Sequence, residues 1–225
     1  MRFDIVLFDF GGTLDGPGDP WLERFARCYQ ACDANVSRAA LCAAFGHSTR
    51  RSYADPDMRT RRLHDTVACH VAWQMEFLAR DDRACTEAIV AAFVAQTRAS
   101  LAASRALLER WRERARLGVI SNFYGNVQLL LDEAGIAPVL TTIVDSAVVG
   151  VAKPDPRIFE LALMGERVPA DRALYVGDSL EKDVAGAHAA GIATAWLPGT
   201  EGIGTHAGEA DFVLQRLEDV EALLA

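Results

Sequence analysis

Hydrophobic positions divide the chain into three stretches with different periodicities. Residues 4–9 form a short apolar run that leads into a Gly-Gly turn, a pattern that favours a buried strand over a helix. Residues 17 to about 110 carry almost no strand signal, and their apolar residues recur at helical spacing. We expect about four amphipathic helices in that stretch, with a break at Asp55-Pro56. One of the helical series is Trp21, Leu22, Phe25 and Tyr29.

From about residue 115 onward, strand and helix patterns alternate. The expected strands are 117–121, 141–145, 173–177, 192–197 and 211–214. The expected helices are 127–134, 156–163, 181–190 and 217–224, and two of them stop at Gly135 and Gly191. This alternation favours a parallel sheet with right-handed crossovers, in which the strand at 4–9 pairs with the later strands.

The helical stretch is then an insertion in the loop after the first strand. We expect an α/β fold with a Rossmann-like parallel sheet core, formed by residues 1–15 and 112–225, and an inserted α-helical cap, formed by residues 16–111. An insertion at the carboxyl end of a strand lies over the edge where such sheets bind ligands. The cap is therefore a candidate lid.

Composition narrows the classes of partner. The 225 residues are 51% hydrophobic and carry a net charge of -8, which argues against nucleic acid and anionic membranes as partners. A locally positive pocket could still hold a small anionic substrate. The first apolar run is interrupted by Asp9 and is too short for a signal peptide, and no apolar stretch approaches the length of a membrane span. Nothing in the composition indicates an oligomeric state.

The cysteines predict a cytoplasmic location. Their number is odd, and they show neither a C-x-x-C pair nor zinc-like spacing. We therefore expect buried, reduced thiols in a cytoplasmic protein. The five are Cys28, Cys32, Cys42, Cys69 and Cys85.

Polar groups gather at the carboxyl ends of the predicted strands. The four stretches are 8–14, 119–122, 152–156 and 176–183. In a parallel sheet they converge on one edge, bringing together carboxylates, a hydroxyl, a lysine and glycine turns with free N–H groups. Phosphoryl transfer needs such a set: a carboxylate to attack phosphorus, Mg²⁺ to screen two approaching anions, and cationic or N–H donors for the phosphoryl oxygens.

These four stretches resemble, in order, the four motifs of the haloacid-dehalogenase-like superfamily. The resemblance covers the first 15 residues and roughly residue 115 to the end, and the helical insertion fits the cap that this family places after its first motif. It implies a Mg²⁺-dependent hydrolase, of the phosphatase type, acting on a small phosphorylated metabolite through an aspartyl phosphate on Asp9.

The resemblance also implies roles for individual residues. The implied catalytic residues are Asp9 as nucleophile, Lys153 and Ser121. The implied phosphate-binding residues are Ser121, Asn122, Lys153 and Thr13, the last of which would also support the turn. The implied Mg²⁺ ligands are Asp9, the backbone carbonyl of Gly11, Asp178 and Asp183. Taken singly, each has an ordinary explanation, such as a helix N-cap for Asp178, and only their joint occurrence favours an active site.

One position departs from the family pattern. Phosphatases of this family carry a second aspartate two residues after the nucleophile, where it protonates the leaving group and later activates water. Here that residue is Gly11, which has no proton to give. A histidine of the cap could replace it, the substrate could have a good leaving group, or the chain could have kept binding and lost turnover. The histidines concerned are His47, His64 and His70.

Three other functions compete with this one. A phosphate- or metabolite-binding protein with a weakened site is the main alternative, because of Gly11. A 2-haloacid dehalogenase is a minor alternative. That branch of the family has tyrosine at the position of Gly11 and usually lacks the Gly-Asp pair that this chain has at Gly177-Asp178. The branch that cleaves phosphonoacetaldehyde needs a cap lysine, and residues 15–116 contain none.

A group of cap arginines could contact an anionic substrate tail or simply be a solvated face: Arg50, Arg51, Arg59, Arg61 and Arg62.

Overall fold

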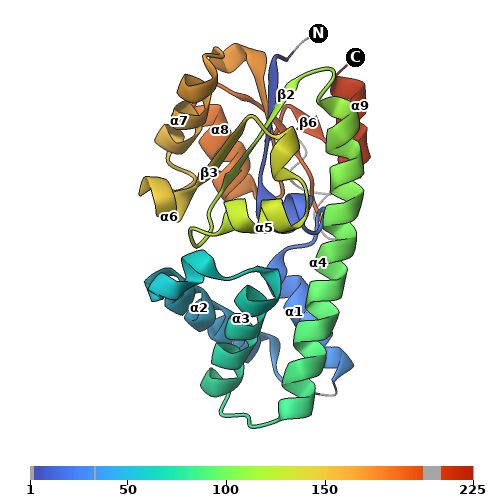
Figure 1. The fold of residues 1–225 in the computed structure, drawn as a ribbon, viewed down its shortest axis with the longest axis vertical. Coiled ribbons are helices and arrows are strands. Elements are labelled where there is room, and N and C mark those ends of the chain that lie inside the picture. The colour runs from blue at the N-terminus through green and yellow to red at the C-terminus, as the bar shows by residue number, and fades with distance from the viewer. Residues whose placement is uncertain (1–2, 33, 200–208, 225) are drawn as a thin grey trace.

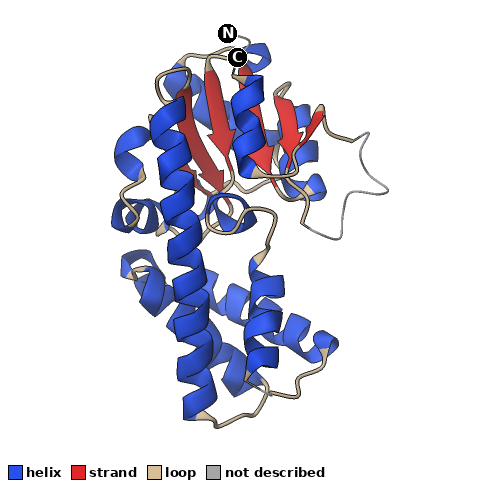
Figure 2. Cartoon of the chain, turned by 90° about the vertical axis from the view of Figure 1, so that its right-hand side faces the viewer, coloured by secondary structure: helices blue, strands red, loops and turns tan. Residues whose placement is uncertain are grey.

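A computed structural model describes residues 3–32, 34–199 and 209–224. These residues contain a six-stranded sheet with the order β3-β2-β1-β4-β5-β6, in which every neighbouring pair is parallel. The strands are β1 Ile5–Phe8, β2 Arg116–Ser121, β3 Thr142–Asp145, β4 Ala173–Gly177, β5 Ala193–Trp196 and β6 Phe212–Val213. The expected α/β fold with a parallel sheet is confirmed, and Figure 2 shows the strands side by side in one layer.

Both faces of the sheet are covered, which explains why β1 is apolar at every position. Ile5 and Leu7 face one core with α7 and α8, whereas Val6 and Phe8 face the other core with α4, α5 and α9 (Figure 1). On the second face the ring of Phe8 stacks on Trp111 of α4, with ring centroids 6.1 Å apart. The helices on these faces are α4 Arg83–Trp111, α5 Val127–Glu133, α7 Pro156–Glu166, α8 Ala185–Ala189 and α9 Val220–Leu223.

The strand order reverses on either side of β1. The chain moves outward from β1 to β2 and β3, and then returns to place β4 on the other side of β1. Sheets of this kind bind ligands outside the carboxyl ends of the strands at such a switch point. The residues that follow β1 and β4 are therefore the place to look for a site.

The insertion after β1 is helical, as expected. Its helices are α1 Trp21–Ala31, α2 Arg38–Ala54, α3 Leu63–Phe77 and α4. α2 ends beside the predicted break, where Asp55 caps the short helical turn Pro56–Thr60. In Figure 1, α1, α2 and α3 lie beyond the carboxyl edge of the sheet, while α4 runs alongside both groups. The division into a core of 1–15 and 112–225 and a cap of 16–111 stays a prediction, because α4 packs on both.

Some elements differ from the expectations. The stretch predicted as one helix at 181–190 is a wide turn at Leu180–Val184 followed by the short α8. The four-residue α6 Ser146–Val149 was not expected, because it is too short to show periodicity, although Asp145 caps it with a side-chain hydrogen bond to the Ala147 N–H. The remaining one-turn segments are Phe10–Leu14, Ala137–Val139, Ala170–Arg172 and Leu217–Asp219.

Two expectations from composition can be compared with the structure. All five cysteines are free thiols, but only Cys28 and Cys85 are buried, and Cys42 is exposed, so the expected burial of the whole set was wrong. Within the described ranges, no helix is both long and apolar enough to cross a membrane.

Candidate active site

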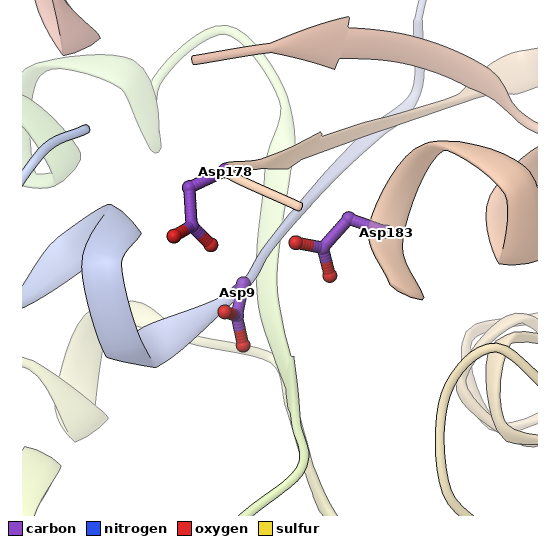
Figure 3. Close-up of side chains that lie close together, drawn as sticks. All are labelled: Asp9, Asp178 and Asp183. Carbon is purple, nitrogen blue, oxygen red and sulfur yellow. The ribbon is translucent and has the colours of Figure 1, made fainter. Parts of the chain in front are cut away.

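Three aspartates meet at the switch point of the sheet. Asp9 directly follows β1, and its N–H donates to the carbonyl of Val176 in β4, 2.9 Å away. Asp178 directly follows β4, and Asp183 lies one turn further on. One oxygen from each carboxylate lies within 4.8 Å of the others, and Figure 3 shows the three side chains close together. The parallel arrangement of β1 and β4 is what brings them together.

A single buried lysine neutralises part of this cluster. The Nζ atom of Lys153 lies 2.8 Å from Oδ1 of Asp9 and 2.6 Å from Oδ1 of Asp183. It also donates to the hydroxyl of Tyr175 at 2.9 Å, so that each of its three protons has an acceptor. The side chain of Asp178 accepts no hydrogen bond from another described residue. Three carboxylates thus share one ammonium group.

Burial, and then the neighbouring charges, shift the pKa values of these groups. Burial raises the pKa of Asp9 to about 6, against the opposing effect of the Lys153 charge. Burial, and then the negative charges of Asp9 and Asp183, raise the pKa of Asp178 well above its usual value. For Lys153, burial alone would lower the pKa, but the Asp183 and Asp9 carboxylates raise it above its usual value. A divalent cation with a preference for oxygen ligands fits the three carboxylates and would supply the missing charge.

Two glycines allow the carboxylates to come this close. A β-carbon on Gly12, whose φ is +85°, would lie 2.4 Å from Oδ2 of Asp178. A β-carbon on Gly177 would lie 2.4 Å from the carboxyl carbon of Asp183. From the sequence we expected these glycines only to form turns with free N–H groups. Their role in making room for carboxylates depends on neighbours that the linear sequence does not reveal.

Asn122 and Ser121 lie beside Lys153 at the end of β2. Both side-chain polar atoms of Asn122 bind the backbone of Lys153: Oδ1 accepts from its N–H at 2.8 Å, and Nδ2 donates to its carbonyl at 2.9 Å. Asn122 therefore holds the lysine in place, and its expected contact with phosphate stays a prediction. Ser121 is buried and lines the same cavity, as do Asp9 and Gly11.

Thr13 is the predicted site residue that the structure does not bring to the cavity. Its side chain is fully buried beneath the wide turn after β1, and its hydroxyl has no hydrogen-bond partner among the described residues. The side chain that braces this turn is instead Asp15, whose Oδ1 accepts the N–H of Gly12 at 2.8 Å. Asp15 in turn pairs with the buried Arg24, at 3.3 Å. The spacing of Gly12 and Asp15 is typical of a side chain that bonds the backbone of a nearby turn, and could have indicated this role.

A second unexpected support lies at the other end of the site. The indole Nε1 of Trp196, at the end of β5, donates to the carbonyl of Asp178 at 2.9 Å. Oδ2 of Asp183 accepts the N–H of Ser179 at 2.9 Å. These bonds fix the turn that carries two of the three aspartates, and Trp196 is a residue that the motifs do not include.

A cavity of about 530 Å³ opens from the aspartates towards the inserted helices. Three aromatic residues of the inserted helices line the cavity: Trp21, Phe45 and Tyr53. Phe123 and Tyr124, which follow β2, complete this wall. The cavity therefore has a charged end at the sheet and an aromatic end beneath the helices.

The cap histidines do not lie in this cavity. His70 is fully buried, and its two ring nitrogens lie 3.1 Å and 3.0 Å from the hydroxyls of Ser48 and Ser52. Burial lowers the pKa of His70 to about 3. His64 is exposed beside Asp65, and neither it nor His47 lines the cavity.

The cap arginines do not line it either. Arg51 pairs with Glu76 on the surface, and Arg61 pairs with Asp55. Arg59 donates to the carbonyl of Ala147 at 3.1 Å. The glycines at 202–208 superficially resemble a phosphate loop, but the sequence predicts a surface loop there because no strand leads into it and no helix follows it; this segment lies outside the described residues.

Comparison with known proteins identifies the class. A family model for haloacid dehalogenase-like hydrolases matches residues 3–191, so the chain belongs to this family, and the resemblance seen in its motifs is confirmed. It is 40% identical over 93 residues to the pyrimidine 5'-nucleotidase YjjG of Escherichia coli (strain K12), which covers 40% of this chain and 41% of that protein. It is 37% identical over 92 residues to the phosphoserine phosphatase of Thermus thermophilus, which covers 40% and 37%. These matches span about two fifths of the relatives' own lengths.

Solved structures agree on the fold. A dehalogenase with an intermediate complex superposes with a TM-score of 0.67 at 16% identity, over 100% of this chain and 98% of that one. A HAD phosphatase from Thermococcus onnurineus superposes with a TM-score of 0.59 at 20% identity, over 100% and 98%. At these identities the likeness shows the fold alone.

Proposed function

We propose that this hydrolase is a Mg²⁺-dependent phosphatase that cleaves a small phosphate monoester through an aspartyl phosphate on Asp9. The observation that carries the proposal is the cluster of Asp9, Asp178 and Asp183 around Lys153, at the switch point of a parallel sheet. The phosphoserine phosphatase and the glyceraldehyde 3-phosphate phosphatases among the relatives act on phosphorylated small molecules, which supports the same class of substrate.

Each residue of the site has a separate role in the proposed reaction. The Asp9 carboxylate attacks phosphorus, an Asp9–phosphorus bond forms, and the ester bond to the leaving oxygen breaks. Lys153 offsets the negative charge of the attacking carboxylate and of the phosphoryl oxygens. Water then attacks the aspartyl phosphate and releases phosphate. Bound Mg²⁺, held by Asp9, Asp178 and Asp183, would reduce the repulsion between the anionic nucleophile and the anionic substrate.

A binding protein with little turnover is the second proposal, and Gly11 favours it. The position of the usual acid–base carboxylate is empty of any titratable side chain, and none of the three cap histidines lines the cavity. General acid–base catalysis contributes about 10²–10⁴-fold, so its loss could reduce turnover severely. A 2-haloacid dehalogenase remains the minor alternative, and the three clustered carboxylates, which suit a metal, argue against it.

The experiment that tests the proposal is phosphate release across a panel of phosphate esters and acyl phosphates, with Mg²⁺ and with chelator. The wild-type protein is compared with Asp9→Asn and with Asp81→Asn, which alters an exposed carboxylate that does not line the cavity. Release that needs Mg²⁺, persists in Asp81→Asn and disappears in Asp9→Asn is the expected result. Release that survives in Asp9→Asn would exclude the aspartyl phosphate, and no release with intact Mg²⁺ binding would favour the binding protein.

A further inference from the structure

The space beside Gly11 is occupied by an indole ring that has no proton to offer. A β-carbon on Gly11 would have Nε1 and Cδ1 of Trp21 as its nearest neighbours, at 3.8 Å and 3.9 Å. The Nε1 proton of this ring is donated to Oδ2 of Asp15, 2.5 Å away. Because Asp15 also pairs with the buried Arg24, the indole is fixed in this position. The nearest side chain to the position of the missing acid is therefore a fixed ring that offers no acidic proton.

Apart from the three carboxylates proposed as Mg²⁺ ligands, the groups around the cavity are weak acids or have their protons engaged. All three protons of Lys153 are engaged by Asp9, Asp183 and Tyr175. Burial raises the pKa of Tyr53 and of Tyr124 above the usual value, so both phenols are weak acids. No histidine is among the described residues that line the cavity.

One further cation reaches the cavity. Lys182 is exposed and belongs to the lining, one residue before Asp183. Its ammonium group is the single lining cation, among the described residues, other than Lys153. Lys182 is therefore the one group that an experiment must test separately as a proton donor.

The far wall of the cavity suits a flat, uncharged group. Its ring centroids lie close together: 4.7 Å between Phe123 and Tyr124, 5.0 Å between Tyr124 and Tyr53, and 5.7 Å between Phe123 and Trp21. No arginine is among the described lining residues, and the two lysines of the lining belong to the end that carries the aspartates, so a carboxylate or a second phosphate on the substrate would find no cation at the aromatic wall. Aromatic rings pack favourably against such walls.

Resting on the phosphatase proposal, we infer that the substrate is an aryl phosphate, the phosphate ester of a phenol with an uncharged ring. In the first step, the bond from Asp9 to phosphorus forms and the bond from phosphorus to the phenolic oxygen breaks. The electron pair leaves with the oxygen as a phenolate, which takes a proton from water after departure. An aliphatic alkoxide is far more basic and needs a proton during bond cleavage, which Gly11 does not provide.

Two isomeric esters test the leaving group directly. 4-Methylphenyl phosphate and benzyl phosphate have the same formula and both carry an aromatic ring, but one releases a phenol and the other an alcohol. We expect kcat/KM with Mg²⁺ to be higher for 4-methylphenyl phosphate by about 10²-fold or more, the contribution of the absent acid. Equal rates for the two isomers would overturn the inference.

Acetyl phosphate tests the aromatic wall, because its leaving group is good but it has no ring. We expect its KM to exceed that of 4-methylphenyl phosphate by about tenfold or more, since it buries no aromatic surface. Comparable KM values would overturn the aromatic assignment. Release from other monoesters but from neither ring compound would overturn this inference alone, whereas no release from any compound would overturn the phosphatase proposal with it.

Matched variants separate the two parts of the inference. Phe45→Leu shortens the aromatic wall and should raise KM for 4-methylphenyl phosphate while leaving KM for acetyl phosphate unchanged. The control is Phe77→Leu on α3, an exposed ring that does not line the cavity. Lys182→Met should leave the ratio of aryl to benzyl rates unchanged. A selective loss of benzyl phosphate hydrolysis in this variant would identify Lys182 as the acid and overturn the inference.

Discussion

The carboxylate of Asp178 occupies the space that a β-carbon on Gly12 would need. Such a β-carbon would lie 2.4 Å from Oδ2 of Asp178, and the φ of +85° at Gly12 is itself unfavourable for other residues. The turn after β1 can therefore pack against the turn after β4 only because Gly12 has no side chain. Gly12 therefore belongs to the proposed metal site although it offers no side-chain ligand.

Gly12→Ala should weaken Mg²⁺ binding, because the new methyl group displaces Asp178. We expect a loss of about 10–100-fold in Mg²⁺ affinity, the usual effect of disturbing the support of a metal ligand. Isothermal titration calorimetry measures it. The control is Gly150→Ala, which has a similar φ of +74° but, among the described residues and apart from its chain neighbours, no heavy atom within 4 Å of its β-carbon. Equal losses in the two variants would show that backbone strain, and not the displaced carboxylate, is responsible.

Gly11→Asp should raise turnover of esters with poor leaving groups. Gly11 has ordinary backbone angles, φ -77° and ψ 115°, and its β-carbon would make only normal contacts with Trp21. The new carboxyl group could then protonate an alkoxide, and we expect kcat for benzyl phosphate to rise by about tenfold or more, within the 10²–10⁴-fold that such groups contribute. Steady-state phosphate release measures it. Gly11→Asn, which has the same shape without a titratable proton, should show no gain, and equal gains in both variants would contradict the explanation.

Asp178→Asn should stabilise the metal-free protein and weaken Mg²⁺ binding. Three carboxylates close to one ammonium group destabilise the metal-free fold, so removing one charge should raise the free energy of unfolding in chelator. The same change should abolish the stabilisation by Mg²⁺, which for the wild-type protein should reach about 2.7 kcal/mol at one hundred times the dissociation constant. Urea unfolding with and without Mg²⁺ measures both effects, with the exposed Asp171→Asn as control. A variant that Mg²⁺ still stabilises fully would exclude Asp178 as a ligand.

The fold could be predicted from the sequence because its strongest signals are local. The apolar run before Asp9 and the alternation after residue 115 indicate a parallel sheet, and the order of the polar stretches places three aspartates and Lys153 at one edge. Each of these inferences depends only on periodicity and on the direction of the strands. The short helix α6 and the split at 180–189 were missed because a few residues carry no measurable period.

The parts of the site that were missed depend on partners far away in the sequence. Asn122 could not be assigned to the backbone of Lys153, nor Trp196 to the carbonyl of Asp178, without the positions of neighbouring strands. Thr13 matches its motif in sequence, yet its side chain points into the core. Which aromatic residues of the helical insertion line the cavity likewise follows from how the helices pack, and not from their spacing.

His70 should make the protein less stable in mild acid. Its ring is fully buried between Ser48 and Ser52, and its ring neighbours are Trp21, Phe25, Phe45 and Tyr124, so no charged group faces it among its described contacts. Burial lowers its pKa from 6.5 to about 3. Between these values the unfolded chain binds a proton that the folded chain does not. The resulting stability is therefore complete above pH 6.5 and is lost as the pH falls towards 3.

His70→Gln should remove this pH dependence, because an amide does not titrate. Relative to their values at neutral pH, the free energy of unfolding of the wild-type protein should fall by about 1.4 kcal/mol more than that of the variant at pH 5.5, and further below that. Urea unfolding at several pH values measures the difference, and the titration of the clustered aspartates cancels because both proteins contain them. His64→Gln removes an exposed histidine and should keep the wild-type pH profile. Parallel profiles for wild type and His70→Gln would contradict the prediction. They would mean that His70 takes up its proton equally well in the folded and the unfolded chain.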